Sequence, residues 1–298
     1  MERPYILHMF TPGKQMSPFD VNMAADAGWQ IIVPYGDVGA DSISAMTQDT
    51  IFSRGPKGAL RSGIFIGGRD VMLAQDMLDK ARAAMFKPFV VSLMADPSGA
   101  FTTAAAMVAS VDAALLRSHG AGLAQRRVLI VGGTGPVGRI AGVMAAQLGA
   151  AVTLAGRSAT SSVQAARETG ERFGVALQGG AAGDRGLLAA ADVVLACATA
   201  GVQVLNEEDL AMATQLKIAA DVNAVPPAGI AGLGVMDDAK PLAGSSAVGI
   251  GALAIGNVKY QTQQRLLVQM RGAEKAVALG VAEALAMARA VLAEPKAA

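Results

Sequence analysis

The chain has 298 residues, of which 52% are hydrophobic and 16% are charged, so it can bury a large core and is not expected to contain long disordered segments. Its 25 basic and 24 acidic residues give a net charge of +1, which excludes the strong positive field used to bind nucleic acid or an anionic membrane. The single cysteine excludes an intrachain disulfide. With only two histidines beside it, the chain has too few such ligands to make a His/Cys metal centre a reasonable expectation.

The mean hydropathy of +0.40 raises the question of a membrane segment. The longest uncharged runs, Ile140–Gly156 and Pro241–Val258, are interrupted by glycine or proline, so neither predicts a continuous apolar helix of about 20 residues. The opening residues Met1–Tyr5 do not resemble a secretory leader. We therefore expect a cytoplasmic protein that does not enter a membrane.

Residues 1–122 alternate short apolar runs with helix-like segments, a pattern typical of an α/β layer with largely parallel strands. Strands are expected at Tyr5–Phe10, Gln30–Tyr35, Ser62–Ile66 and Phe89–Met94. Helices are expected at Phe19–Ala27, Asp41–Asp49, Asp70–Phe86 and Phe101–Ser118.

A second alternating pattern begins at Arg126 and predicts a Rossmann-type, doubly wound parallel sheet. Its expected strands are Arg127–Val131, Ala151–Ala155, Asp192–Ala198 and Lys217–Val222, and its expected helices are Pro136–Leu148, Thr160–Phe173 and Glu207–Thr214. Residues Asn223–Gly256 are expected to form loops with short strands, and helices are expected at Asn257–Gln269 and Gly272–Leu292. The predicted domains are an NAD(P)-binding domain, 123–256, and a discontinuous α/β substrate domain, 1–122 with 257–298.

A glycine-rich turn follows the strand Arg127–Val131 and opens the next helix, as a dinucleotide fingerprint requires. Its cofactor-binding candidates are Gly133, Thr134, Gly135, Pro136, Val137 and Gly138. We expect Gly133 to permit the tight turn, Gly135 to admit the pyrophosphate, and Gly138 to allow close contact between helix and strand. The free N–H groups of the helix would bind the phosphates. The alternative interpretation is a sharp turn without a ligand.

The end of the second strand indicates which dinucleotide binds. Sites for NAD usually place an acidic residue there to bind the ribose 2′-hydroxyl. Here Arg157 and Ser158 occupy that place, and they suit the additional 2′-phosphate of NADP. NADP is therefore favoured and NAD stays open, as does the interpretation of Arg157 as a surface residue.

Several motifs together resemble bacterial methylene-tetrahydromethanopterin dehydrogenases, in the branch that accepts NAD as well as NADP. The resemblance runs nearly end to end and is carried by the glycine turn, Gly156-Arg157, 17–20, 65–68, 98–106, 221–227 and 249–256. It implies transfer of a hydride from the methylene carbon of a tetrahydromethanopterin-type pterin to NADP or NAD, in one-carbon (formaldehyde) oxidation.

The resemblance also implies site residues. It places Asn223 and Gly251 with the cofactor, and Asp20, Thr102, Thr103 and Lys259 with the pterin. Without it, Asp20 and the threonines would be interpreted as helix caps and Lys259 as a solvated surface residue. We expect Lys259 to position the pterin by hydrogen bonding, because a cation beside the reacting carbon would oppose the forming methenyl cation.

Other functions stay open on the sequence alone. They are a methylene-tetrahydrofolate dehydrogenase, a reductase resembling shikimate dehydrogenase, and a non-catalytic NADP-binding sensor. Cys197, His8 and His119 are expected to be structural, and no metal site is predicted. The alanine-rich helices favour a homo-oligomer.

Overall fold

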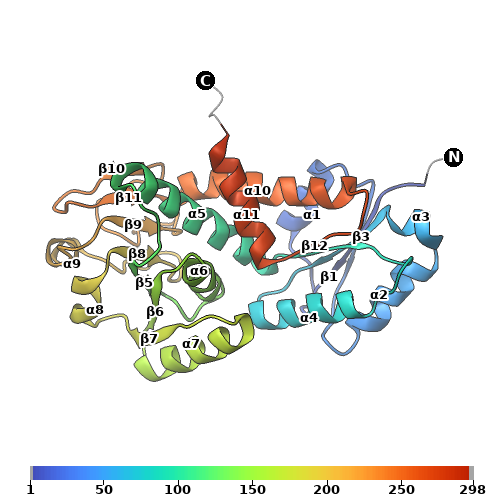
Figure 1. Cartoon of the computed structure of the whole chain (residues 1–298), viewed down its shortest axis with the longest axis horizontal. Helices are drawn as coiled ribbons and strands as arrows, with labels where there is room; N and C mark the ends of the chain where they lie inside the picture. Colours follow the sequence, from blue (N-terminus) through green and yellow to red (C-terminus); the bar gives the residue numbers. More distant parts are fainter. Residues whose placement is uncertain (1–2, 295–298) are drawn as a thin grey trace. The chain divides into compact units, whose positions relative to one another are not determined.

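The computed structural model describes residues 3–294, which fold as two compact units (Figure 1). The first unit runs to Thr102 and takes in Tyr260–Met287, and the second consists of Thr103–Lys259 and the chain from Ala288. The division falls within three helices, α5 (Ala100–His119), α10 (Ala252–Gly272) and α11 (Val281–Ala293). Each unit is described by itself.

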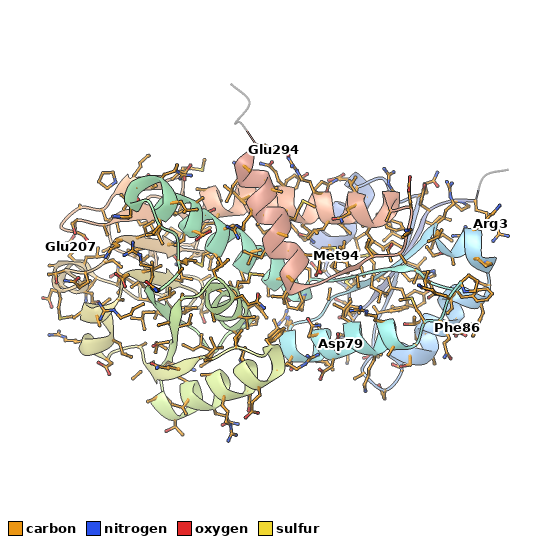
Figure 2. The ribbon with its side chains drawn as sticks, viewed as in Figure 1. Arg3, Asp79, Phe86, Met94, Glu207 and Glu294 are labelled. Carbon is orange, nitrogen blue, oxygen red and sulfur yellow. The ribbon has the colours of Figure 1, made fainter. Side chains whose placement is uncertain are left out.

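The first unit is built on a five-stranded parallel sheet in the order β12-β4-β3-β1-β2. Its strands are β1 (Ile6–Phe10), β2 (Ile31–Tyr35), β3 (Ser62–Ile66), β4 (Ser92–Ala95) and β12 (Ala278–Leu279). The central strand β3 is buried along its whole length, as expected for a sheet covered on both faces. Met94 in β4 is likewise buried, whereas Phe86, in the turn before β4, is 50% exposed (Figure 2).

Four helices join the strands of this sheet: α1 (Pro18–Asp26), α2 (Ile43–Phe52), α3 (Gly55–Ala59) and α4 (Val71–Ala83). Helix α4 begins where the Asp70 carboxylate accepts hydrogen bonds from the N–H groups of Met72 and Leu73, at 2.9 and 3.2 Å. Such a cap satisfies N–H groups that have no partner inside the helix.

The second unit holds a seven-stranded sheet in the order β10-β11-β9-β8-β5-β6-β7. Its parallel strands are β5 (Arg127–Val131), β6 (Ala151–Gly156), β7 (Gln178–Ala181), β8 (Val193–Ala196), β9 (Ile218–Asp221) and β11 (Val248–Ile250); β10 (Asp238–Pro241) is antiparallel. The chain runs outward from β5 through β6 to β7, then returns to β8 on the other side of β5. The pair β5/β8 is therefore the topological switch point, where ligands of such sheets bind. The α/β fold class predicted from the sequence is confirmed.

Helices α6 (Pro136–Gln147), α7 (Ala159–Phe173), α8 (Arg185–Ala190) and α9 (Glu207–Met212) connect the strands of this unit, and α5 precedes β5. The segment Pro97–His119, which includes α5, is long and apolar enough to cross a membrane. However, 83% of its most apolar 18-residue stretch is buried within the fold. The core helix of a soluble protein has the same length and composition.

Asp192 ties together the amino ends of three strands in this sheet. Its carboxylate accepts hydrogen bonds from the N–H of Arg127 at 2.9 Å and from the Lys217 ammonium at 2.8 Å. These partners begin or precede β5 and β9, and Asp192 itself precedes β8. Burial by itself would raise the pKa of Asp192, but the two hydrogen bonds together with the positive charges of Lys217 and Arg127 hold the pKa below its usual value.

Most expected elements are present, and the differences have local causes. Helix α4 ends at Ala83 and β4 begins only at Ser92, because Phe86 and Phe89 pair in a tight turn around Lys87-Pro88. Helix α10 begins at Ala252, five residues before the expected start, so Gly256 lies inside it despite a helix penalty of about 1 kcal/mol.

The last helix was expected to begin at Gly272 and begins at Val281. The intervening residues include Ala278 and Leu279, which pair with β4 as the edge strand β12. The sequence also gave no indication of α3, β7 or α8, which are short and rich in glycine or alanine.

Candidate functional site

The glycine turn between β5 and α6 is fixed by close contacts between backbone segments. Gly132 has a φ of 79°, and a Cβ placed there would lie 2.5 Å from the backbone N of Ala198 and C of Cys197. The residue of this turn that takes up the left-handed conformation is therefore Gly132, whereas Gly133, which was expected to permit the tight turn, has no positive φ. The double glycine Gly132-Gly133 was the available signal.

Gly133 and Gly138 are required by packing. A Cβ on Gly133 would lie 2.8 Å from the carbonyl O of Ile130 and the Cα of Leu154 in β6, and one on Gly138 would lie 2.7 Å from the carbonyl O of Gly132. Gly138 thus packs on the turn itself. These contacts draw the start of α6 over the end of β5.

The N-terminus of α6 has features that suit an anion. Gly135 is its N-cap residue and Pro136 its first residue, and among the described residues no side chain caps the helix. A Cβ on Gly135 would meet only the carbonyl O of Gly132, at 3.3 Å, so backbone and ligand can approach each other here. First-turn N–H groups and the helix dipole suit a pyrophosphate. The turn therefore fits a dinucleotide.

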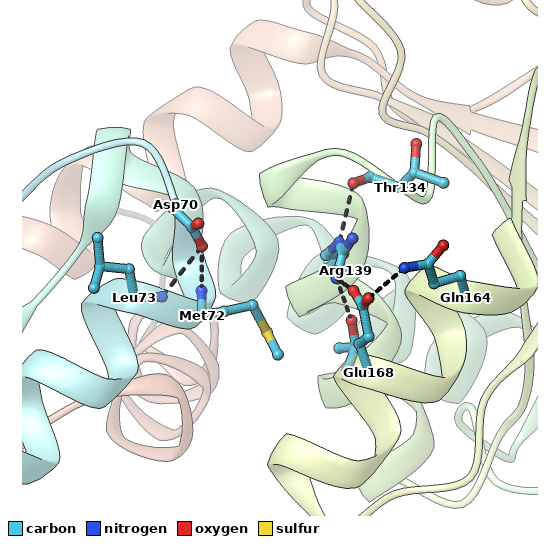
Figure 3. A network of polar contacts seen from close by, with 8 residues as sticks. Asp70, Met72, Leu73, Thr134, Arg139, Gln164 and Glu168 are labelled. Atoms are coloured by element: carbon cyan, nitrogen blue, oxygen red, sulfur yellow. Dashed lines mark hydrogen bonds and ion pairs between the residues drawn. The ribbon is translucent and has the colours of Figure 1, made fainter. Parts of the chain in front are cut away.

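Arg139 holds the turn from within α6 (Figure 3). Its Nε donates to the carbonyl O of Thr134 at 3.1 Å, and its Nη1 donates to Glu168 at 3.3 Å and to Thr169 at 3.2 Å. The hydrogen bond from Gln164 and then the one from Arg139 lower the pKa of Glu168. Helix α7 therefore supports the position of Thr134, while Thr134 itself is only partly buried. This role of Arg139 could not be predicted from the sequence, because its partners Glu168 and Thr169 lie about 30 positions away.

Arg157 and Ser158 lie just beyond the carboxyl end of β6, the strand next to the glycine turn. Both are exposed. Ser158 is the N-cap of α7: its Oγ accepts from the N–H of Ser161 at 3.4 Å, and its carbonyl accepts from the Ser162 hydroxyl at 2.9 Å. The exposed guanidinium beside a helix N-terminus can bind a phosphate in this arrangement.

Asn223 follows β9 and is 6% exposed. Its Oδ1 accepts from the N–H groups of Gly201 and Val225 at 3.1 and 2.9 Å, and its Nδ2 donates to the carbonyl O of Pro227 at 2.9 Å. Three backbone groups thus engage the amide. Asn223 therefore holds the loops after β8 and β9 in place, and its contact with the cofactor stays a prediction.

Gly251 precedes α10 and is buried. A Cβ there would collide with the carbonyl O of Gly234 and lie 2.6 Å from that of Val235, while the Gly251 N–H donates to the carbonyl O of Asp237. The N–H groups of Leu253 and Ala254 in α10 also donate to the carbonyl O of Val235. Gly251 therefore allows close packing at the start of α10, and its cofactor contact stays a prediction.

Asp20 is 3% exposed in the first turn of α1 and accepts a hydrogen bond from Gln263 Nε2 at 2.8 Å. Gln263, 0% exposed, lies in α10 four residues after Lys259. Residues four apart share one face of a helix. The half-buried Lys259 thus lies on the face of α10 that carries the partner of Asp20. Sequence reasoning missed Gln263.

The two adjacent threonines differ in their surroundings. Thr102 is fully buried, and its hydroxyl donates to Asp96 Oδ2 at 2.6 Å, while Asp96 Oδ1 accepts from the N–H groups of Phe101 and Thr102. Asp96 therefore caps the start of α5. Thr103 is partly buried, and no side-chain hydrogen bond of its hydroxyl appears among residues 3–294. Of the pair, Thr103 is the better candidate to contact a ligand.

Of the residues expected to be structural, Cys197 and His8 are partly buried, whereas His119, at the end of α5, is exposed. Cys197 follows β8 with its Sγ 3.8 Å from Met107 Sδ, and burial, then the nearby Asp221 carboxylate, raise the pKa of the thiol to about 12. His8 Nδ1 lies 3.2 Å from Tyr35 Oη, and burial lowers its pKa. Within residues 3–294 no three His, Cys, Asp or Glu side chains gather in a way that could hold a metal ion.

An open hollow of about 490 Å³ lies beside α1 in the first unit, at the carboxyl ends of β1 and β2. Its lining combines one cation and two amides with apolar side chains, from Lys14, Gln15, Met16, Pro18, Val21, Asn22, Pro34 and Gly36. No pattern in the sequence predicted this hollow.

Comparison with known proteins identifies the family. Residues 18–98 match the family model described as methylene-tetrahydromethanopterin dehydrogenase, N-terminal. An NAD(P)-dependent methylenetetrahydromethanopterin dehydrogenase of Methylorubrum extorquens is 46% identical over 289 residues, which cover 95% of this chain and 97% of that protein. The bifunctional protein MdtA of the same organism is 31% identical over 269 residues, 89% of this chain and 91% of that protein.

Among solved structures, quinate dehydrogenase from Corynebacterium glutamicum in complex with NAD is similar with a TM-score of 0.52 at 13% identity, covering 98% of this chain and 99% of that one. This likeness shows the fold alone. The near full-length relatives show more: the chain belongs to the family of methylene-tetrahydromethanopterin dehydrogenases, as the resemblance in its motifs predicted.

Proposed function

We propose that this chain is an NAD(P)-dependent methylene-tetrahydromethanopterin dehydrogenase. It transfers a hydride from the methylene carbon that bridges two nitrogens of the reduced pterin to the nicotinamide, and it leaves the methenyl form. The observation that carries the proposal is the 46% identity across 95% of the chain to a protein of that activity. The close backbone contacts of the turn at residues 132–138 and the N-terminus of α6 that follows it support the proposal.

The bound dinucleotide supplies the hydride acceptor, and the second unit supplies its site. The uncapped N-terminus of α6 binds the pyrophosphate, and Arg157 with Ser158 binds the 2′-phosphate of NADP. Asn223 keeps the loops after β8 and β9 in place. An exposed arginine that replaces the usual acid favours NADP and still admits NAD.

The hydride transfer needs little acid–base catalysis from the side chains. The nitrogen lone pairs of the pterin stabilise the methenyl cation as the hydride leaves, so no side chain has to remove a proton in that step. The residues must align donor and acceptor and exclude water. The scarcity of histidine in the chain is compatible with this mechanism.

The pterin contacts are assigned to residues near α10 and α5. Asp20, held by Gln263, presents a buried carboxylate that binds pterin N–H groups or favours the cation. Thr103 offers a hydroxyl, while Thr102 keeps the start of α5 in place through Asp96. Lys259 binds the pterin by hydrogen bonding, one helical turn before Gln263.

The remaining parts of the proposal concern organisation. The pterin-binding domain comprises residues 1–122 with 257–298, and the NAD(P)-binding domain comprises 123–256. The enzyme works in the cytoplasm as a homo-oligomer, a state that its alanine-rich helices favour. Its partner is the small-molecule pterin.

The test is the absorbance of reduced nucleotide with methylene-tetrahydromethanopterin as substrate and NADP, then NAD, as acceptor. We expect rapid reduction, much faster than with methylene-tetrahydrofolate. Faster turnover of the folate would identify the alternative dehydrogenase. No reduction with either pterin, by protein that binds nucleotide, would contradict the dehydrogenase and leave a nucleotide-binding sensor.

A further inference from the structure

A buried carboxylate at the carboxyl end of β9 is held by backbone N–H groups. Asp221 is 3% exposed, and its Oδ1 and Oδ2 accept from the N–H groups of Asn223 and Gly229, each at 2.8 Å. The N–H of Ile230 also hydrogen-bonds it. Burial raises the pKa of Asp221 against these three bonds, which lower it. A carboxylate so placed organises the backbone around it.

The chain around Asp221 is shaped to this arrangement. A Cβ on Gly229 would lie 2.8 Å from both carboxylate oxygens, so only glycine fits there without movement. Asp221 accepts a hydrogen bond from the N–H of Asn223. The side chain of Asn223 in turn holds the backbone of Gly201, Val225 and Pro227. The side chains of Asp221 and Asn223, two positions apart, therefore fix the loop after β8 and the segment 223–230 together.

The position of these loops in the sheet indicates which part of the cofactor they face. A doubly wound domain has two mononucleotide-binding halves, and the cofactor lies across the carboxyl ends of the strands at the switch point. The half β5-β6-β7 carries the glycine turn and Arg157, which belong with the adenosine half of the cofactor. The other half, β8 and β9, carries the loops fixed by Asp221 and Asn223.

We propose that Asp221 is a positioning residue for the nicotinamide half of the cofactor. It fixes the loops after β8 and β9, which line this half of the site. The proposal rests on the proposed function in one respect, namely that a nicotinamide dinucleotide is the cofactor. Asp221 acts through the backbone and does not touch the reacting atoms.

Replacement by asparagine tests this role at nearly constant volume. Asp221→Asn turns one accepting oxygen into an NH₂ group, which faces a backbone N–H and repels it. Gly229→Ala pushes against the carboxylate from the other side. Both changes release the same segment, so they should produce the same defect.

The experiment compares two ligands by calorimetry: NADP, and 2′-phospho-ADP-ribose, which lacks the nicotinamide. We expect both variants to bind NADP roughly tenfold more weakly or worse, which corresponds to about 1.4 kcal/mol. Their affinity for 2′-phospho-ADP-ribose should stay within about twofold of wild type, because the glycine turn and Arg157 are unchanged. A merely structural role would not separate the two ligands.

Asp192→Asn is the matched control, because Asp192 also accepts a backbone N–H in this unit but lies at the opposite, amino end of the strands. It should lower the melting temperature and leave both affinities within about twofold. Unchanged NADP affinity in either folded variant, or an equal loss for both ligands, would overturn the proposal. If Asp221→Asn does not fold, Gly229→Ala alone decides.

Binding and turnover separate this inference from the proposed function. A wild-type protein that binds NADP but does not oxidise either pterin overturns the proposed function and leaves the comparison of ligands valid. A wild-type protein that binds the nicotinamide-free fragment as tightly as NADP overturns the role of Asp221, whatever its turnover.

Discussion

Replacing Gly132 by alanine tests whether the backbone contacts of the glycine turn determine both stability and nucleotide binding. Two effects add in this variant. The φ of 79° places the new residue in the left-handed region, which costs an L-residue about 1–2 kcal/mol. The new Cβ also lies 2.5 Å from backbone atoms of Cys197 and Ala198, which cannot rotate away. Overpacking of this kind costs about 1–3 kcal/mol.

Gly174→Ala isolates the first effect. Gly174 ends α7 with a φ of 68°, and nothing lies within 4 Å of a Cβ placed there. Gly132→Ala should therefore destabilise the protein by about 3 kcal/mol and Gly174→Ala by about 1 kcal/mol. At roughly 2–4 °C per kcal/mol, the expected losses in melting temperature are about 6–12 °C and 2–4 °C.

The assay is thermal unfolding of both variants with and without NADP, together with titration of NADP into each folded variant. Gly132→Ala should bind NADP at least roughly tenfold more weakly, because the shifted turn carries the start of α6 with it. Gly174→Ala should bind as wild type does. Equal melting temperatures for the two variants, or full NADP affinity in Gly132→Ala, would refute the reasoning.

Four further predictions concern single side chains. Arg157→Ala should weaken NADP binding roughly 10- to 100-fold and change NAD binding less than about twofold, because only NADP offers a phosphate there; equal losses in titrations of both would rule this out. Lys259→Met should strongly reduce turnover at nearly constant NADP affinity, and unaltered kcat would remove Lys259 from the mechanism. Thr102→Val should lower the melting temperature, whereas Thr103→Val should lower kcat and keep the melting temperature; the reverse pattern would exchange their roles. Asp192→Asn should destabilise the protein at pH 7 by about 1–3 kcal/mol. Because folding lowers the pKa of Asp192, its stabilisation is present above the unfolded value of about 3.9 and is lost as the pH falls through the folded value, so denaturant melts should show the difference closing in acid. A difference that does not depend on pH would contradict this.

The sequence was informative where structure depends on neighbours in the chain. The strand Arg127–Val131, the glycine turn and the start of α6 are local, and their pattern predicted both the fold class and the dinucleotide site. Even there, the sequence could not assign the left-handed φ to Gly132. That assignment depends on how close the turn comes to Cys197 and Ala198, some 65 residues away.

Residues that act through distant partners could not be predicted. Nothing near Asp20 points to Gln263, 243 positions along the chain. Thr102 resembles a helix cap, but the capping carboxylate belongs to Asp96. The start of α10 was misplaced because Gly256 suggested a loop, although the flanking alanine, leucine and isoleucine residues favour a helix.

The ion pairs of Asp192 lie at one end of strands whose other end carries the glycine turn, Cys197 and Asp221. An enzyme engineer can therefore strengthen the first end, with further charge pairs or shorter connections, without touching residues that meet a ligand. The same holds for natural mutations, since changes near the loops that lower stability could be offset by stabilising changes at the amino ends of the strands. We expect libraries targeted to the amino ends of β5, β8 and β9 to yield heat-resistant variants that keep the native preference for nucleotide.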